Sequence, residues 1–205
     1  MLTQKKANIA VLVSGGGTNL QALIDAQNDG VIKHGELKLV ISDNDKAYAL
    51  VRANMAKIAA KTVIKSEYES KEKFEDAIIA LLDEYNIDLI VLAGFLTILT
   101  SHFTSKYPER IINVHPSLIP SFCGKGFYGL KVHKAALDYG VKVSGATVHF
   151  VNEVPDGGRI ILQKAVAINK DDTPESLQQR IMRQAEWKIL PRAVEIVSKE
   201  IYKDK

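Results

Sequence analysis

Residues 8–23 read NIAVLVSGGGTNLQAL and pass directly from an apolar run, through three glycines, into a helical pattern. The run at 8–13 is short and uninterrupted, as expected of a buried strand. After the glycines, apolar residues recur at Leu20, Leu23 and Ile24, which is the spacing of one helix face. A strand that turns tightly into a helix is the first half of a βαβ unit. This stretch therefore predicts an α/β fold with a parallel sheet.

The same alternation of strands and helices continues through the first half of the chain. The run at 87–94, IDLIVLAG, is apolar throughout, which is typical of a central parallel strand covered on both faces. Right-handed crossovers between such strands build a doubly wound sheet. We expect the other elements of this half to be strands at 37–42, 61–64 and 110–114, and helices at 46–56 and 70–86.

The pattern changes after residue 115. A loop rich in Gly, Pro and Ser leads to a helix at about 130–140, and two strand-like runs then flank the turn EVPDG. Those runs, at 142–152 and 158–168, are predicted to be antiparallel neighbours. A long helix should begin at Thr173 and Pro174 and reach residue 200, with a break or kink at Pro191.

We therefore expect one domain over residues 1–205, with a mostly parallel, doubly wound, Rossmann-like sheet and an antiparallel C-terminal portion. Its two lobes would be residues 1–115 and 116–205.

The composition excludes several classes of protein. The 205 residues are 46% hydrophobic and 25% charged, and the formal net charge of +3 comes from scattered basic residues. A nucleic-acid partner usually requires a concentrated basic stripe, so none is expected. No run reaches the length of a membrane span, and the basic, apolar N-terminus leads straight into the glycine turn, unlike a signal peptide. The single cysteine, Cys123, fits a reducing compartment, so a cytoplasmic location is expected.

The glycine turn is a candidate phosphate site. Three glycines allow a sharp turn and close approach of a ligand, and Thr18 or Asn19 could cap the following helix. The free N–H groups of a helix start suit a phosphate. The dinucleotide fingerprint fails because Leu20 stands at its third glycine position, and no Gly-Lys-Ser/Thr follows for a P-loop. A weak candidate for a ribose-binding acid is Asp43 or Asp45. A tight turn without a ligand remains an open alternative.

The run NVHPSLIP at 113–120 places an amide and an imidazole where a strand leaves the sheet. Residues two apart in a strand point the same way, so Asn113 and His115 should share a side. Pro116 disfavours helical geometry at His115 and keeps its backbone extended. An asparagine amide and a histidine together could stabilise a carbonyl oxygen that becomes an oxyanion. A purely structural pair, with each side chain bonded to nearby backbone, is the alternative.

The run VPDGG at 154–158 also allows two interpretations. Asp-Gly is a common hairpin turn, whereas Asp156 is also the kind of acid that a catalytic histidine needs as a partner. His149 lies within a predicted strand, where we expect a core or supporting role. No HExxH or CxxC pattern occurs, so a metal site is not expected.

Five segments together carry a family resemblance: VLVSGGGTNLQALIDA, DLIVLAGFLTIL, INVHPSLIPSF, GATVHFVNEVPDGGRIILQ and RIMRQAEWKILPRAVEIV. In this order, over nearly the whole chain, they resemble the phosphoribosylglycinamide formyltransferases of purine biosynthesis, which belong to the folate-dependent formyltransferases. The resemblance implies transfer of a formyl group from 10-formyltetrahydrofolate, a co-substrate, to the amine of glycinamide ribonucleotide. It implies no metal and no partner beyond these small molecules, and it leaves open a monomer or a homodimer.

The resemblance also implies roles for individual residues. Asn113, His115 and Asp156 match the catalytic residues of the family, and His149 matches a supporting histidine. The substrate phosphate would lie on the turn of the first lobe, and Glu186 matches an acid that contacts the ribose or glycinamide part. The residues implied for substrate binding are Gly16, Gly17, Thr18, Asn19 and Glu186. Those implied for folate binding, in the catalytic second half and the loop after 87–94, are Lys71, Leu96, Thr97, Ile98, Leu99, Val151 and Asp156.

Two positions depart from some members of the family. Thr97 and Lys71 stand where those members have arginine near the folate tail, so the contact to that tail is open. Lys125 lies in a loop longer than in some members and could reach the phosphate or solvent. Competing functions are the initiator-tRNA formyltransferase and the formyltetrahydrofolate hydrolase, which carry extra domains, or a phosphate-ligand sensor without catalysis.

Overall fold

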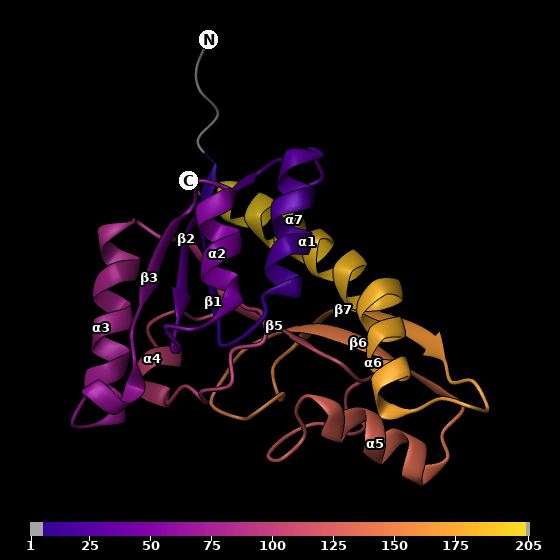
Figure 1. Cartoon of the computed structure of the whole chain (residues 1–205). Coiled ribbons are helices and arrows are strands. Elements are labelled where there is room, and N and C mark those ends of the chain that lie inside the picture. The colour runs from indigo at the N-terminus through magenta and orange to yellow at the C-terminus, as the bar shows by residue number, and fades with distance from the viewer. Residues whose placement is uncertain (1–5, 204–205) are drawn as a thin grey trace.

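The computed structural model of the chain describes residues 6–203, and its strands there form a single mixed sheet (Figure 1). The order across the sheet is β3-β2-β1-β4-β5-β6-β7. The pairs from β3 to β5 are parallel, and β5-β6 and β6-β7 are antiparallel. This confirms the predicted fold class. The strands are β1 (Ala7–Val13), β2 (Gly35–Ser42), β3 (Ala59–Thr62), β4 (Leu89–Leu92), β5 (Ile111–His115), β6 (Val143–Phe150) and β7 (Ile160–Ala167).

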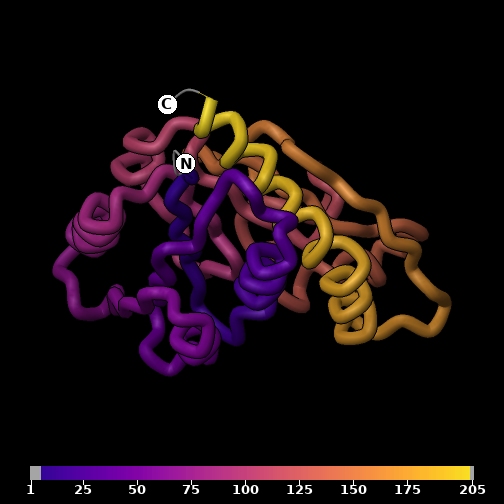
Figure 2. The backbone as a smooth tube through the Cα atoms, turned by 90° about the horizontal axis from the view of Figure 1, so that it is seen from above, coloured from indigo at the N-terminus to yellow at the C-terminus, as the bar shows by residue number. Residues whose placement is uncertain are grey.

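Helices cover both faces of the sheet because its central strands are apolar on both sides. On β1, Ile9 and Val11 pack into one core with α1, α2, α6 and α7, whereas Ala10 and Leu12 pack into a second core with α3. Figure 2 shows α7 (yellow) lying beside α1 (indigo). The helices are α1 (Thr18–Asn28), α2 (Tyr48–Met55), α3 (Lys71–Glu84), α4 (Ser101–Thr104), α5 (Leu130–Tyr139), α6 (Pro174–Ile181) and α7 (Trp187–Lys203).

The strand order reverses between β1 and β4, and open α/β sheets bind ligands at such a switch point. The loops after these two strands meet there. Ser14 donates its backbone N–H to the carbonyl of Gly94 (3.2 Å), and its hydroxyl accepts from the N–H of Leu96 (2.9 Å). The edge that carries the glycine turn is therefore joined directly to the loop after β4.

Most predicted elements are present, with shifted ends. β3 begins two residues before the predicted run, and β4 is confined to Leu89–Leu92. The predicted domain ends at residues 1 and 205 lie outside the described part of the chain. The expected hairpin partners β6 and β7 are confirmed as antiparallel neighbours.

A break or kink was predicted at Pro191, and the structure contradicts the break. Pro191 lies inside α7, and the irregularity is a π-helical turn at Met182–Glu186. Proline lacks the N–H that would bond to the carbonyl of Trp187, and its ring crowds that carbonyl. Since the wide turn ends just before Trp187, the irregularity falls one turn before the proline rather than at it. This turn carries Glu186.

The cap predicted at Thr18 or Asn19 is also wrong. The N-cap of α1 is Gly17, in the left-handed region with φ 71°, and no side chain caps the helix. A Cβ at Gly17 would lie 2.7 Å from Cβ and 2.8 Å from Cα of Ala49, so the turn packs against α2 without room for a side chain. Glycine here satisfies both a backbone conformation and a close approach of two helices.

We expect Gly17→Ala to lower the free energy of unfolding by about 1–3 kcal/mol. Alanine at this position would have an unfavourable positive φ, and its Cβ would clash with Ala49. Gly16→Ala is the matched control, since a Cβ there meets nothing within 4 Å. Urea unfolding of both variants measures the difference. Equal stability of the two variants would contradict the packing argument.

Candidate active site

Strand β5 presents Asn113 and His115 beside β6. In the antiparallel register Asn113 lies opposite His149 and His115 lies opposite Thr147. The strand continues through His115, so the two side chains point the same way, as predicted. His115 and His149 are both buried, whereas Asn113 is half-buried.

Asp156 reaches this pair from the loop between β6 and β7. The N–H of Gly157 bonds to the carbonyl of Val154 (2.9 Å), so Pro155 and Asp156 are the central residues of the turn. Asp156 has φ 57°, and a proline followed by a positive φ is the arrangement of a type II turn. The predicted Asp-Gly hairpin is therefore displaced by one residue, and it is Asp156 that occupies the position that favours glycine.

The carboxylate of Asp156 joins three segments. Its Oδ2 lies 3.4 Å from Nδ1 of His115, and its Oδ1 lies 3.6 Å from Nε2 of His149. Oδ2 also accepts a hydrogen bond from the backbone N–H of Gly124 (2.8 Å). The structure thus brings together Asn113, His115, His149 and Asp156, which the sequence motifs had singled out separately.

The second nitrogen of each histidine faces a backbone carbonyl. Nε2 of His115 lies 2.9 Å from the oxygen of Phe122, and Nδ1 of His149 lies 2.7 Å from the oxygen of Phe150. A carbonyl can only accept, so these two nitrogens carry hydrogen. The nitrogens that remain free to gain or lose a proton therefore both face Asp156, and Nδ2 of Asn113 lies 3.3 Å from Nε2 of His149.

The charges of this group are coupled. Burial lowers the pKa of His115, while the negative charge of Asp156 and the bond to Phe122 oppose that shift. Burial alone would raise the pKa of Asp156, but its contacts with His149, His115 and Gly124 outweigh burial and hold the pKa below its ordinary value. Asp156 is therefore ionised near neutral pH beside a mainly neutral His115, which would gain a proton if negative charge developed nearby.

A further histidine lies behind the group. His133 on α5 is fully buried, and neither of its ring nitrogens has a partner within the protein. Burial, together with the nearby His115, lowers the pKa of His133 to about 4. It is thus uncharged near neutral pH and adds no positive charge beside His115.

A cleft of about 120 Å³ opens onto Asn113, His149 and Asp156. Its opposite wall is the loop after β4, where Leu96 and Ile98 are 65% and 57% exposed. Of the residues predicted for folate, Leu96, Thr97, Ile98, Leu99, Val151 and Asp156 line this cleft. Lys71 does not; it is exposed at the start of α3. The hydroxyl of Thr97 donates to Asp43 (2.8 Å), the acid considered above for a ribose.

Asn19, in the first turn of α1, contacts Glu186, at the end of the π-helical turn. Nδ2 of Asn19 donates to Oε2 of Glu186 (2.7 Å), and Oδ1 of Asn19 is buried without a partner. Burial raises the pKa of Glu186 to about 7, although the bond from Asn19 opposes the shift. This hydrogen bond joins the first turn of α1, just after the glycine turn, to the π-helical turn, which is distant in sequence.

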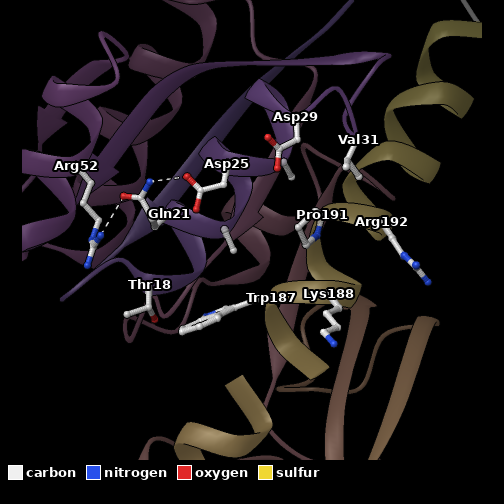
Figure 3. Close-up of a pocket in the computed structure, with 12 residues that line it drawn as sticks. Thr18, Gln21, Asp25, Asp29, Val31, Arg52, Trp187, Lys188, Pro191 and Arg192 are labelled. Carbon is white, nitrogen blue, oxygen red and sulfur yellow. Dashed lines mark hydrogen bonds between the residues drawn. The ribbon is translucent and has the colours of Figure 1, made fainter. Parts of the chain in front are cut away.

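The larger cavity, about 480 Å³, lies elsewhere, between α1, α2 and α7. Figure 3 shows Gln21 bridging Arg52 and Asp25, with Lys188 and Arg192 on α7. None of the four grouped residues lines this cavity. Convergent titratable groups with shifted pKa values mark a functional site better than volume does, so we assign the site to the smaller cleft.

Two contacts of the site carry no signal in the sequence. The carbonyl of Phe122 and the N–H of Gly124 are backbone atoms, and only the path of the loop brings them to His115 and Asp156. Lys125, in the same loop, is exposed. Among residues 6–203 no group of His, Cys, Asp or Glu is arranged to hold a metal ion. Over the same residues, no helix has the length and apolarity needed to span a membrane.

Comparisons with known proteins agree with one another. Residues 7–194 match the family model described as formyl transferase. The chain is 41% identical over 186 residues to a phosphoribosylglycinamide formyltransferase of Haemophilus influenzae, covering 91% of this chain and 84% of that protein. A crystal structure of glycinamide ribonucleotide transformylase 1 from Symbiobacterium toebii superposes with a TM-score of 0.90 and 40% identity, covering 97% and 90% of the two chains.

Longer relatives show that a similar sequence occurs within larger proteins. The human trifunctional purine biosynthetic protein adenosine-3 is 41% identical over 195 residues, or 95% of this chain. The chain spans only 14–19% of the length of four such trifunctional relatives, so the similarity concerns one part of them.

We expect the stability of the protein to depend on the ionisation of Glu186. Its folded pKa of about 7 lies above the ordinary 4.5, so its contribution is fully present below pH 4.5 and is lost as the pH rises through 7. Relative to wild type, Glu186→Gln should therefore gain on the order of 3 kcal/mol in free energy of unfolding between pH 5 and 8. Urea unfolding of both proteins across this range measures the gain; a difference independent of pH would contradict the shifted pKa.

Proposed function

The chain belongs to the formyl transferase family, as its sequence motifs had predicted, and on this premise we propose that it transfers a formyl group from 10-formyltetrahydrofolate to the amine of phosphoribosylglycinamide. This reaction is a step of purine biosynthesis, and it uses two small-molecule substrates. The observation that carries the proposal is that Asn113, His149 and Asp156 line one cleft. The buried His115 lies 3.4 Å from the carboxylate of Asp156.

The two substrates would approach this group from opposite sides. The ribonucleotide phosphate would lie on the backbone of Gly16, Gly17, Thr18 and Asn19, where the free N–H groups at the start of α1 favour an anion. Glu186, with its high pKa, and the unpartnered Oδ1 of Asn19 would contact the ribose or glycinamide part. The folate would lie in the cleft, against Leu96, Ile98 and the loop from Val151 to Asp156.

The reaction itself is a direct transfer. The substrate amine attacks the formyl carbon, so a C–N bond forms and the carbonyl oxygen becomes an oxyanion. The amide of Asn113 donates to this oxygen, and His115 stabilises it more strongly as it gains a proton. The intermediate then collapses, the bond from carbon to N10 of the folate breaks, and the proton lost by the amine is transferred to N10. Neither Cys123 nor Ser117 is required as a nucleophile.

Asp156 would support this proton transfer by its charge. The free nitrogens of His115 and His149 both face its carboxylate, and the charge of Asp156 favours a positive charge on the His115 ring. Near neutral pH His115 begins mainly neutral, since burial lowers its pKa. It can therefore accept a proton from the attacking amine and return it to the leaving group, directly or through water.

An assay of the purified protein with 10-formyltetrahydrofolate, with and without the ribonucleotide, tests the activity through the absorbance of the folate. We expect turnover only when the ribonucleotide is present. Release of formate without it would instead indicate a hydrolase. Binding of both substrates without turnover would indicate a sensor, and either result would overturn the proposal.

The role of Asp156 is tested by Asp156→Asn. We expect kcat to fall by about 10²–10³-fold, because the amide cannot stabilise a charged imidazole. Folding should be nearly normal, since an amide of the same shape replaces the carboxylate. Asp138→Asn, which removes an exposed carboxylate from α5, is the control and should retain wild-type kcat. Unchanged turnover in Asp156→Asn would exclude this role.

A further inference from the structure

The loop after β4 forms one wall of the cleft but has no regular structure of its own. β4 ends at Leu92 and α4 begins at Ser101, and residues 93–100 belong to neither. Backbone hydrogen bonds hold the two ends of this loop, at Ala93, Gly94 and Thr100, but residues 95–99 make none to other backbone groups of the described chain. Its position depends on contacts that other segments make with it.

Three side chains outside the cleft hold the loop. The hydroxyl of Ser14 accepts from the N–H of Leu96, and Asp43 accepts from the hydroxyl of Thr97 (2.8 Å). The C-terminal end of the loop is held by Glu75 on α3, which accepts two short bonds from Thr100. Oε1 lies 2.6 Å from the backbone N–H, and Oε2 lies 2.6 Å from the hydroxyl.

Glu75 is unusual among these contacts because it is 1% exposed. Its neighbours on α3 include Phe74 and Ile78, which are fully buried in the apolar core on this side of the sheet. A carboxylate in such surroundings is costly unless it is hydrogen-bonded, and both of its oxygens are used on one residue. Bonds in a low dielectric are also stronger than bonds at the surface, and Glu75 is the most buried of the three residues that hold the loop.

The hydrogen bonds from Thr100 to Glu75 affect the cleft wall because Thr100 lies only two residues from Ile98. Thr100 follows Leu99, which is buried in the same core, and Leu99 follows Ile98, whose side chain lines the cleft. The hydroxyl of Thr100 also accepts from the N–H of His102 and so caps α4 (3.2 Å). If Thr100 moves, Ile98 and the backbone beside it must move too.

We propose that Glu75 is a positioning residue for formyl-folate: its buried carboxylate fixes Thr100 and thereby holds the wall at Leu96–Leu99 in the shape that receives the co-substrate. Glu75 itself does not line the cleft. The inference rests on the proposed function for the identity of the ligand, but the anchoring of the loop does not. Preorganised walls bind more tightly because no loop must be ordered when the ligand arrives.

The test compares Glu75→Gln with Asp76→Asn. In Glu75→Gln an NH2 group, which only donates, replaces one of the two oxygens that accept from Thr100. Asp76 is the next residue of α3, and it pairs with His102 of α4 (2.8 Å) at a more exposed position, so its variant is the matched control. We expect Glu75→Gln to raise the KM for formyl-folate about tenfold. Its kcat and the KM for the ribonucleotide should stay within about twofold of wild type, and Asp76→Asn should change none of the three.

A second measurement is independent of catalysis. Amide hydrogen exchange of the peptide covering residues 94–104 should be faster in Glu75→Gln than in wild type or Asp76→Asn, with no substrate present. Titration calorimetry with tetrahydrofolate should show the same loss of affinity as the KM. In Thr100→Val the hydroxyl is lost. The double variant with Glu75→Gln should lose less binding free energy for tetrahydrofolate than the sum of the losses in the two single variants.

The outcomes separate this inference from the proposed function. Faster exchange and weaker folate binding with kcat preserved support the anchor. Unchanged exchange and unchanged KM in Glu75→Gln overturn it, as does an equal loss in all kinetic parameters, which would indicate general damage to the fold. Absence of formyl transfer by the wild-type protein would reject the proposed function, whereas the exchange result would still decide whether Glu75 fixes the loop.

Discussion

One carboxylate, that of Asp156, connects the parts of the candidate site. It faces His115 on β5 and His149 on β6, and it accepts a bond from Gly124 in the loop before α5. Each histidine is fixed from its other side by a backbone carbonyl, so neither ring can turn away without losing a bond. The charge of Asp156 also affects the chemistry of His115, because it favours the protonated imidazole and opposes the effect of burial. Position and chemistry of the site thus depend on the same group.

The part of the site proposed for the ribonucleotide depends on a contact between residues far apart in the chain. Asn19 lies in the first turn of α1 and Glu186 ends the π-helical turn, and they meet because α1 and α7 pack on the same face of the sheet. Burial leaves Glu186 with a pKa of about 7 and leaves Oδ1 of Asn19 without a partner. Such unpaired, costly groups are expected where a ligand completes the hydrogen bonds. This is the physical basis for placing the ribonucleotide there in the proposal.

Sequence reasoning succeeded where the signal is local. The continuous apolar runs and the helix periods located nearly all of the elements, and the change of pattern after residue 115 correctly indicated antiparallel strands. It failed where the outcome depends on packing. The cap of α1 is Gly17 because Ala49 leaves no room for a side chain, and the irregularity lies before Trp187 rather than at Pro191. Asp156 occupies the turn position that favours glycine, and from there its carboxylate reaches both His115 and His149.

Residue types at fixed spacing along the chain were enough to predict the sheet type and the strand end that carries Asn113 and His115, and five motifs in order carried the resemblance to the family. Which of these side chains meet became clear from the folded structure. It selected the cleft beside Asp156 over the larger cavity between α1, α2 and α7, and it brought the carbonyl of Phe122 and the N–H of Gly124 into the site. It also buried Glu75 against Thr100. Charge, pKa and backbone contacts are set by distance and burial in space, and the order of residues in a chain specifies neither directly.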